Sequence, residues 1–206
     1  MIISCQFIML DRRPYRESAL IASGLSPDYG KISFVLHGAQ KVSEKNFPVA
    51  DLFRELEIEF NDDGNPKELY TAKSVEMLSS FDNIANDSRS FKMAGRIASF
   101  LLKNSPPNLP QPYTYDSLRS VLANLAQLDC GHDHWTLEQC AVVIKSAYLC
   151  ENGLLPETRN ETQNDFLENL VASGIDNSPL PECNPRYWSM LNNWLNSLIE
   201  FHHLKR

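Results

Sequence analysis

Several features that would assign this chain to an enzyme or membrane class are missing from its 206 residues. No apolar run approaches the roughly 18 residues that a membrane-spanning helix needs. No P-loop, no G-x-G-x-x-G motif and no nucleophile–base pair is present, so catalysis has no support and no cofactor is expected. The apolar run at residues 2–10 follows no basic segment, and it predicts a first strand rather than a signal peptide.

Cysteine is scarce, and the spacing of the cysteines does not indicate a disulfide framework. The five cysteines are an odd number without a C-x-x-C pair, which favours a reducing cytoplasm over a disulfide-bonded protein. One stretch, CGHDHWTLEQC, places Cys130, His132, His134 and Cys140 close together. Their spacing matches no standard zinc finger, and Cys140 lies on the apolar stripe of a predicted helix, so we predict no metal site.

Positive charge is also scarce, and where it occurs it is local. The net charge of −7 argues against a surface that binds nucleic acid everywhere. Residues 1–48, however, carry six Lys/Arg against four Asp/Glu, which leaves −9 on residues 49–206. The densest cationic cluster surrounds Pro14 and Tyr15, and its members are Arg12, Arg13 and Arg16.

What is present in the first third is the alternation typical of short strands. We predict five strands, at 2–9, 19–23, 32–36, 55–60 and 67–72. A turn at residues 26–30 separates the second strand from the third. In the fourth strand Glu55, Glu57 and Glu59 alternate with apolar residues, which predicts an acidic outer face. Five such strands predict a small OB-fold barrel, although periodicity alone leaves an SH3-like barrel open.

From about residue 75 the apolar period becomes helical. Stripes near 91–101, 118–128, 137–148, 166–171 and 188–199 predict helices. Thr136 with Gln139 predicts a capping box, Asn184-Pro185 predicts a helix start, and Gly153 and Gly174 predict helix ends. The predicted fold class is α+β, with an OB-fold domain at 1–78 and a helical bundle domain at 79–206.

The run RRPYRESALIASGLSPDYGKISFVLHGAQK resembles the N-terminal OB domain of the RecO family of DNA repair proteins. The resemblance is best over residues 8–60 and continues more weakly in AVVIKSAYLCENGLLPE. It implies a non-catalytic protein that binds single- and double-stranded DNA and anneals complementary strands. It also implies help for RecA in replacing single-strand binding protein (SSB), usually with RecR, and uptake of the acidic SSB C-terminal tail by the helical domain.

The chain departs from that family in two places, and the first departure lowers the expected DNA affinity. Where the family often has Lys-Gly-Ala-Arg, this chain has His37-Gly38-Ala39-Gln40, with Lys41 close by. Each lost phosphate contact lowers the salt slope of binding by about 0.7–0.9. The family's four-cysteine zinc site is also missing, because residues 157–166 contain no cysteine.

A DNA surface on an OB barrel needs a cationic groove and exposed aromatic rings. The predicted contacts are Arg12, Arg13, Tyr15, Arg16, Lys31, His37, Lys41 and Lys45. The competing interpretation is a solvated surface with Tyr15 packed on the barrel. In that case the chain is a protein-interaction adaptor that has the RecO-like fold and little affinity for DNA.

Overall fold

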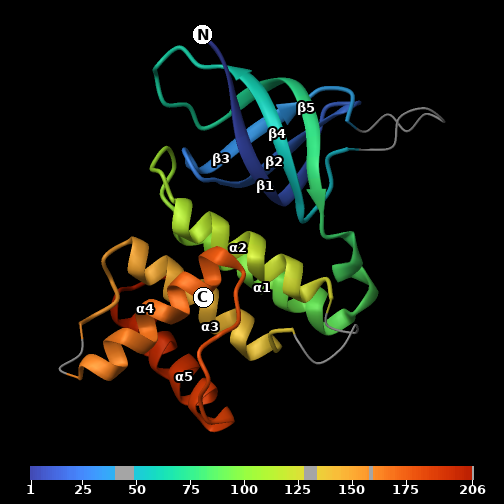
Figure 1. The fold of residues 1–206 in the computed structure, drawn as a ribbon. Helices are drawn as coiled ribbons and strands as arrows, with labels where there is room; N and C mark the ends of the chain where they lie inside the picture. The colour runs from blue at the N-terminus through green and yellow to red at the C-terminus, as the bar shows by residue number, and fades with distance from the viewer. Residues whose placement is uncertain (40–48, 128–133, 158–159, 206) are drawn as a thin grey trace. The chain divides into compact units, whose positions relative to one another are not determined.

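The computed structural model describes residues 1–39, 49–127, 134–157 and 160–205 (Figure 1). They form two compact units. The first consists of Met1–Asp82 and Leu101–Pro112, and the second of Asn83–Phe100 and Tyr113–Arg206. Within the described ranges, no helix is long and apolar enough to cross a membrane.

The first unit is a closed five-stranded barrel. Its strands are β1 (Ile2–Tyr15), β2 (Ala19–Ser26), β3 (Gly30–Leu36), β4 (Arg54–Asn61) and β5 (Tyr70–Ser80). They are ordered β1-β2-β3-β5-β4, with β4 pairing back onto β1. All pairs are antiparallel except β3 with β5. This arrangement confirms the predicted α+β class and OB-type barrel.

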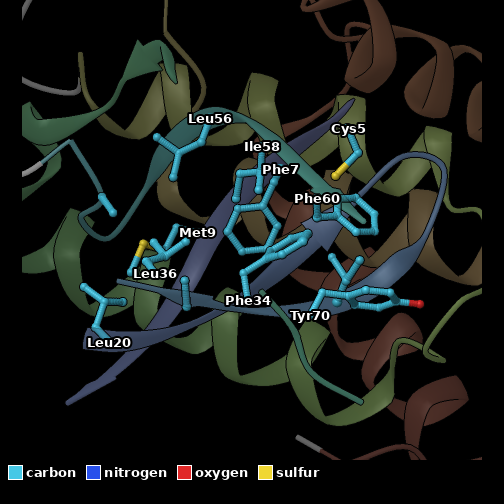
Figure 2. Packing of buried hydrophobic residues seen from close by; sticks show 13 residues of the cluster. Cys5, Phe7, Met9, Leu20, Phe34, Leu36, Leu56, Ile58, Phe60 and Tyr70 are labelled. Carbon is cyan, nitrogen blue, oxygen red and sulfur yellow. The ribbon is translucent and has the colours of Figure 1, made fainter. Parts of the chain in front are cut away.

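Aromatic rings fill the barrel (Figure 2). Phe34 lies between Phe7 and Phe60, with ring centroids 5.3 and 5.2 Å apart in edge-to-face geometry. All three rings are fully buried and come from three different strands. Edge-to-face pairs of this kind add about 0.5–1.5 kcal/mol each to the gain from burial. The alternation of the sequence therefore directs these rings to the barrel axis.

The first strand is longer than predicted. The predicted strand ends at Met9, but β1 continues to Tyr15 because Arg12–Tyr15 pair with residues 22–19 of β2. Pro14 is tolerated there because this end of β1 pairs with β2, while its pairing with β4 stops at Ile8. Backbone pairing thus outweighs the local preference for a loop.

The last strand is also longer than predicted, and one acidic residue is not on the outer surface. β5 runs to Ser80, where a helical period was expected, because it pairs along the length of β4. Glu55 was predicted on an acidic outer face, yet it is 5% exposed and accepts a hydrogen bond from Ser79 Oγ at 3.0 Å. Glu59 is exposed as predicted.

The helices are η1 (Asp82–Asn86), α1 (Ser88–Asn104), α2 (Pro112–Leu125), α3 (Leu137–Glu151), α4 (Glu161–Asp176) and α5 (Pro185–Phe201). Their predicted start signals are confirmed. Thr136 and Gln139 form the capping box of α3, and the Asn184 side chain caps α5 with Pro185 in its first turn. These caps satisfy backbone N–H groups that have no partner within the helix.

One helix end is close to its prediction, and one stripe residue is misplaced. The helix expected to end near Gly174 continues two residues further, to Asp176, and the left-handed residue is Asn177, with φ 51°. A Cβ at Gly174 would lie 2.7 Å from Val143 Cγ1, so the glycine permits close packing of α4 on α3. Phe91 was placed on the inward stripe of α1 but is exposed.

The segment that follows α1 lies along the β2–β3 turn within the first unit. Lys31 N donates to Pro106 O at 3.2 Å, and Gln111 N donates to Pro27 O at 2.9 Å. Gly30 is at the turn with φ +58°, and a Cβ there would meet Pro106 O at 2.8 Å and would lie even closer to Leu109 O. Only glycine combines this backbone angle with this close approach.

We therefore expect Gly30→Ala to lower the free energy of unfolding by about 2–4 kcal/mol, because it adds a backbone clash to an unfavourable φ. Urea titration followed by far-UV circular dichroism measures the loss. Gly64→Ala is the matched control, since Gly64 has φ +80° with open space around it. The control should lose about 1 kcal/mol. Equal losses in the two variants would contradict the close-approach argument.

Candidate nucleic-acid interface

Five of the predicted contacts gather at one end of the barrel. Arg12 and Arg13 are exposed on β1, Tyr15 ends that strand, and Arg16 opens the three-residue loop to Ala19 of β2. His37 follows β3, whose last residue, Leu36, pairs with Leu20 of β2. The β-ladder therefore brings His37 to the same end as the arginines. We call these residues the cationic ribbon: Arg12, Arg13, Tyr15, Arg16 and His37.

The remaining predicted contacts are not part of this cluster. Lys31 begins β3 and pairs with Leu25, which pairs in turn with Ile8, so it lies toward the opposite end of the ladder. Lys41 and Lys45 lie outside the described residues. The candidate site is thus smaller than the set predicted from sequence.

A β-bulge determines where the ribbon points. The β1–β2 register shifts between Met9 and Asp11, directly after the β1–β4 ladder ends at Ile8. Bulges of this kind bend a strand and redirect its side chains. From Asp11 onward β1 pairs with β2 alone, so the arginines stand on a two-stranded extension of the barrel wall.

Arg16 has an unusual backbone. Its φ is 53°, in the left-handed region that side-chain-bearing residues rarely occupy. In this conformation its guanidinium carbon lies 5.1 Å from the centroid of the Tyr15 ring. A cation over an aromatic face contributes about 0.5–1 kcal/mol at an exposed site. The contact keeps a planar cation beside an aromatic ring at the tip of the hairpin.

The other two arginines are engaged by carboxylates. Arg12 Nη1 lies 2.9 Å from Asp51 Oδ1, and Arg13 Nε lies 2.9 Å from Asp11 Oδ2. The Arg12 and Arg13 side chains are 52% and 77% exposed, so solvent screens both pairs. Exposed pairs of this type contribute about 0–1 kcal/mol. Both guanidiniums can therefore exchange their carboxylate partner for another anion. Each one, however, already has an anionic partner within the chain.

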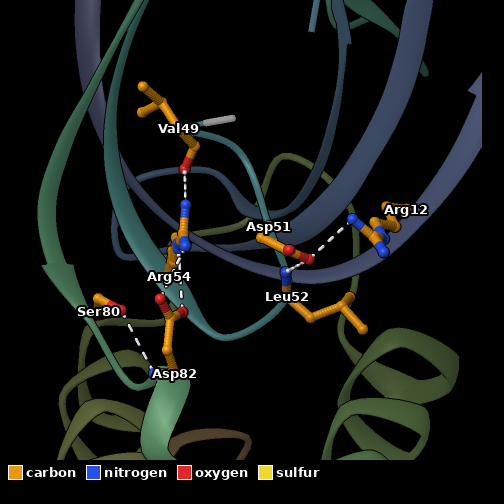
Figure 3. A network of polar contacts seen from close by, with 7 residues as sticks. All are labelled: Arg12, Val49, Asp51, Leu52, Arg54, Ser80 and Asp82. Carbon is orange, nitrogen blue, oxygen red and sulfur yellow. Dashed lines mark hydrogen bonds and ion pairs between the residues drawn. The ribbon is translucent and has the colours of Figure 1, made fainter. Parts of the chain in front are cut away.

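Asp51 is fixed in place by the segment that carries it (Figure 3). Its Oδ1 accepts from Leu52 N at 2.7 Å. On the same segment, Arg54 Nη1 donates to Val49 O at 3.1 Å, and Arg54 Nε and Nη2 donate to the two Asp82 carboxylate oxygens at 3.0 and 2.7 Å. The segment therefore presents the Asp51 carboxylate to Arg12 from a defined position.

The Arg54–Asp82 pair is the tightest charge contact in this network. The Arg54 side chain is 7% exposed, and Asp82 is 52% exposed. The hydrogen bond from Arg54 holds the pKa of Asp82 below its usual value, and the same bond raises the pKa of Arg54. A bidentate guanidinium–carboxylate contact is both directional and strong. It ties the start of β4 to Asp82, the first residue of η1.

Sequence reasoning overlooked Asp51, Arg54 and Asp82. A signal for Arg54 was present, because its position alternates in phase with the inward residues Leu56 and Ile58. A charged residue on the inward register requires a nearby polar partner. The identity of that partner had no local signal, since Asp82 is 28 residues further along the chain.

The Cys/His stretch offers no metal site among the residues that the structure describes. Cys130 and His132 lie outside those residues. Cys140 is fully buried on α3, and burial raises the pKa of its thiol to about 12. A thiol with this pKa is protonated at neutral pH and behaves as a small apolar side chain.

The fold and the ribbon define a class of protein: an OB-type barrel with a cationic hairpin, joined to a helical unit. Comparison with known families narrows this class. Residues 1–81 match the family described as Recombination protein O N terminal.

Curated relatives agree with that match. Proteins named DNA repair protein RecO from Listeria welshimeri and Listeria innocua are each 29% identical over 135 residues, 66% of this chain and 51% of theirs. The one from Mesoplasma florum is 26% identical over 118 residues, 57% of this chain and 44% of its own. The resemblance to the RecO family is therefore confirmed. The chain spans about half the length of the curated relatives it matches.

The Arg54–Asp82 pair predicts a pH-dependent contribution to stability. Because the folded pKa of Asp82 is lowered, its contribution is present above the unfolded pKa of about 4 and is lost as the pH falls through the lower folded value. We expect Asp82→Asn to cost about 1–3 kcal/mol at pH 7 and progressively less below pH 4. Urea titrations across this pH range measure the difference.

Asp63→Asn is the matched control, because the pKa of Asp63 is also lowered by an ion pair, but its partner Lys67 is exposed, whereas Arg54, the partner of Asp82, is buried. Its effect on unfolding should be within experimental error. A cost at Asp82 that does not change with pH would contradict the assignment to its charge.

Proposed function

We propose that this chain is a non-catalytic DNA-binding protein of recombinational repair that holds single-stranded DNA along the cationic ribbon. The observation that carries the proposal is the clustering of three arginines and Tyr15 on one hairpin of an OB-type barrel, in a chain of net charge −7. Cations placed together against an acidic background favour a localised anionic ligand.

The ribbon suits binding without sequence recognition. Guanidiniums form paired hydrogen bonds with phosphate oxygens, and an aromatic ring stacks on any base. At the hairpin tip, the Tyr15 ring and Arg16 lie together and provide both functions within one nucleotide's reach. Contacts to the backbone position a strand and leave its base edges free. Free base edges are what a second, complementary strand needs in order to anneal.

Within this proposal, the partners are those of the RecO family: RecA, whose loading the chain assists, RecR, and the C-terminal tail of SSB. The second unit offers an apolar groove of about 230 Å³ between α4 and α5 for an apolar or aromatic peptide end. Its lining residues are Gln163, Leu167, Tyr187, Met190, Leu191 and Trp194. Met190 is 66% exposed on this groove.

A second candidate function is a protein-interaction adaptor with little DNA affinity. It is favoured by the charge balance of the ribbon, where Arg12 pairs with Asp51, Arg13 pairs with Asp11, and Glu17 follows Arg16 in the sequence. It is also favoured by His37 and Gln40, which replace two cations of the family pattern. Salt-insensitive binding to a protein partner, with none to DNA, would support the adaptor.

The decisive experiment is fluorescence anisotropy of a labelled single-stranded oligonucleotide across a salt series. We expect binding that weakens steeply with salt, because phosphate contacts release counterions. The variant Arg12→Ala/Arg13→Ala/Arg16→Ala should bind at least about tenfold more weakly and have a salt slope lower by about 2.

The matched control is Lys67→Ala/Lys73→Ala/Lys92→Ala, which removes the same charge from exposed positions outside the ribbon. It should retain nearly all affinity. Equal losses in both triple variants would place the binding elsewhere, and no binding at low salt would reject the DNA-binding proposal.

The ion pair of Arg12 with Asp51 predicts a variant with increased, rather than decreased, affinity for DNA. Asp51→Asn removes the carboxylate that competes with phosphate for Arg12, so DNA affinity should rise by about two- to fivefold at low salt. The same anisotropy assay measures the gain. Asp28→Asn, which removes an exposed carboxylate at the β2–β3 turn, serves as the control for net charge. An equal gain in the control would show a general charge effect.

A further inference from the structure

A second pocket in the helical unit differs from the α4–α5 groove in its chemistry. It has a volume of about 260 Å³ and lies where the end of α3 and the loop after it face α4. Its apolar floor is formed by Leu155, Pro156, Leu167 and Val171. Asn164 and Cys150 complete the lining together with two carboxylates, Glu157 and Glu168.

Both carboxylates stand on the rim of this pocket. Glu157 and Glu168 are exposed, and neither forms a hydrogen bond or ion pair with another described residue. Carboxylates also act on the exposed Cys150 of the lining, since Glu151 and Glu168 add to desolvation in raising the pKa of its thiol. Residues 150–176 carry six carboxylates and one arginine, so the surroundings add to the negative charge of the rim.

We propose that this pocket docks an arginine side chain, flanked by apolar residues, from a segment of a partner protein. The occupant follows from charge complementarity. An apolar floor edged by two carboxylates, neither of which bonds to another residue in the part of the chain that the structure describes, matches a side chain with an apolar stem and a cationic head. The planar guanidinium offers five donors in a fixed fork that suits carboxylates, whereas a lysine ammonium acts as a compact point charge.

The same chemistry excludes other occupants. A nucleic acid or an acidic peptide would bring like charge to Glu157 and Glu168, and a purely apolar segment would bury these carboxylates without partners. This pocket is therefore selective for a cationic partner, whereas the cationic ribbon is selective for an anionic one. Its occupancy does not depend on DNA binding, so the two proposals can fail separately.

The experiment uses the full chain labelled with ¹⁵N and three acetylated pentapeptides that differ only at the centre. Each has the form glycine–leucine–X–leucine–glycine amide, where X is arginine, citrulline or glutamate. Citrulline is the neutral isostere of arginine. We expect amide shifts around Cys150, Leu155 and Val171 to saturate with the arginine peptide, and at least about fivefold weaker binding of the other two.

The test variant is Glu157→Gln/Glu168→Gln, and the matched control is Glu161→Gln/Asp165→Asn, which removes two exposed carboxylates of α4 that do not line the pocket. The test variant should lose the preference for arginine over citrulline, and the control should keep it. Equal binding of all three peptides, shifts located elsewhere, or the same loss in the control would each overturn the proposal.

Discussion

The architecture of the first unit depends on one strand that serves two partners in succession. The first half of β1 closes the barrel against β4, and the second half forms a ribbon with β2. Ile8 is where the two ladders meet, because it pairs with both Glu55 and Leu25. A strand that stopped at Met9 would still close the barrel, but it would leave the arginines on an unpaired loop. The ladder therefore gives the ribbon its rigidity.

Among the described residues of this unit, the ion pair of the buried Arg54 and the exposed ion pairs of the cationic ribbon have different roles. In the Arg54–Asp82 contact the arginine is shielded from solvent, and the contact holds the start of β4 next to Asp82. The Arg12–Asp51 and Arg13–Asp11 contacts are open to solvent and add little to stability. Because exposed pairs exchange partners readily, the two carboxylates can separate from the arginines without changing the fold.

Much of the fold follows from local patterns, and the site follows from contacts that such patterns do not encode. The alternation around Leu56 predicted a half-buried strand, and Thr136 with Gln139 predicted where α3 begins, because both depend on neighbours within a few residues. The extension of β1 to Tyr15 was not predicted, because a polar segment with a proline becomes a strand only when β2 pairs with it. Likewise, the partner of Arg12 lies 39 residues along the chain, so its charge compensation had no signal in sequence spacing.

The first unit is discontinuous in sequence, since it needs Leu101–Pro112 as well as Met1–Asp82. The backbone bonds from Lys31 to Pro106 and from Gln111 to Pro27 are made only once this later segment is available. During synthesis, domains fold as units from the N-terminus at about 5–20 residues per second. The barrel strands emerge from the ribosome several seconds before the segment that covers their β2–β3 turn. In the nascent chain, this turn therefore remains without its covering segment until all of α1 and the residues up to Gln111 have been made.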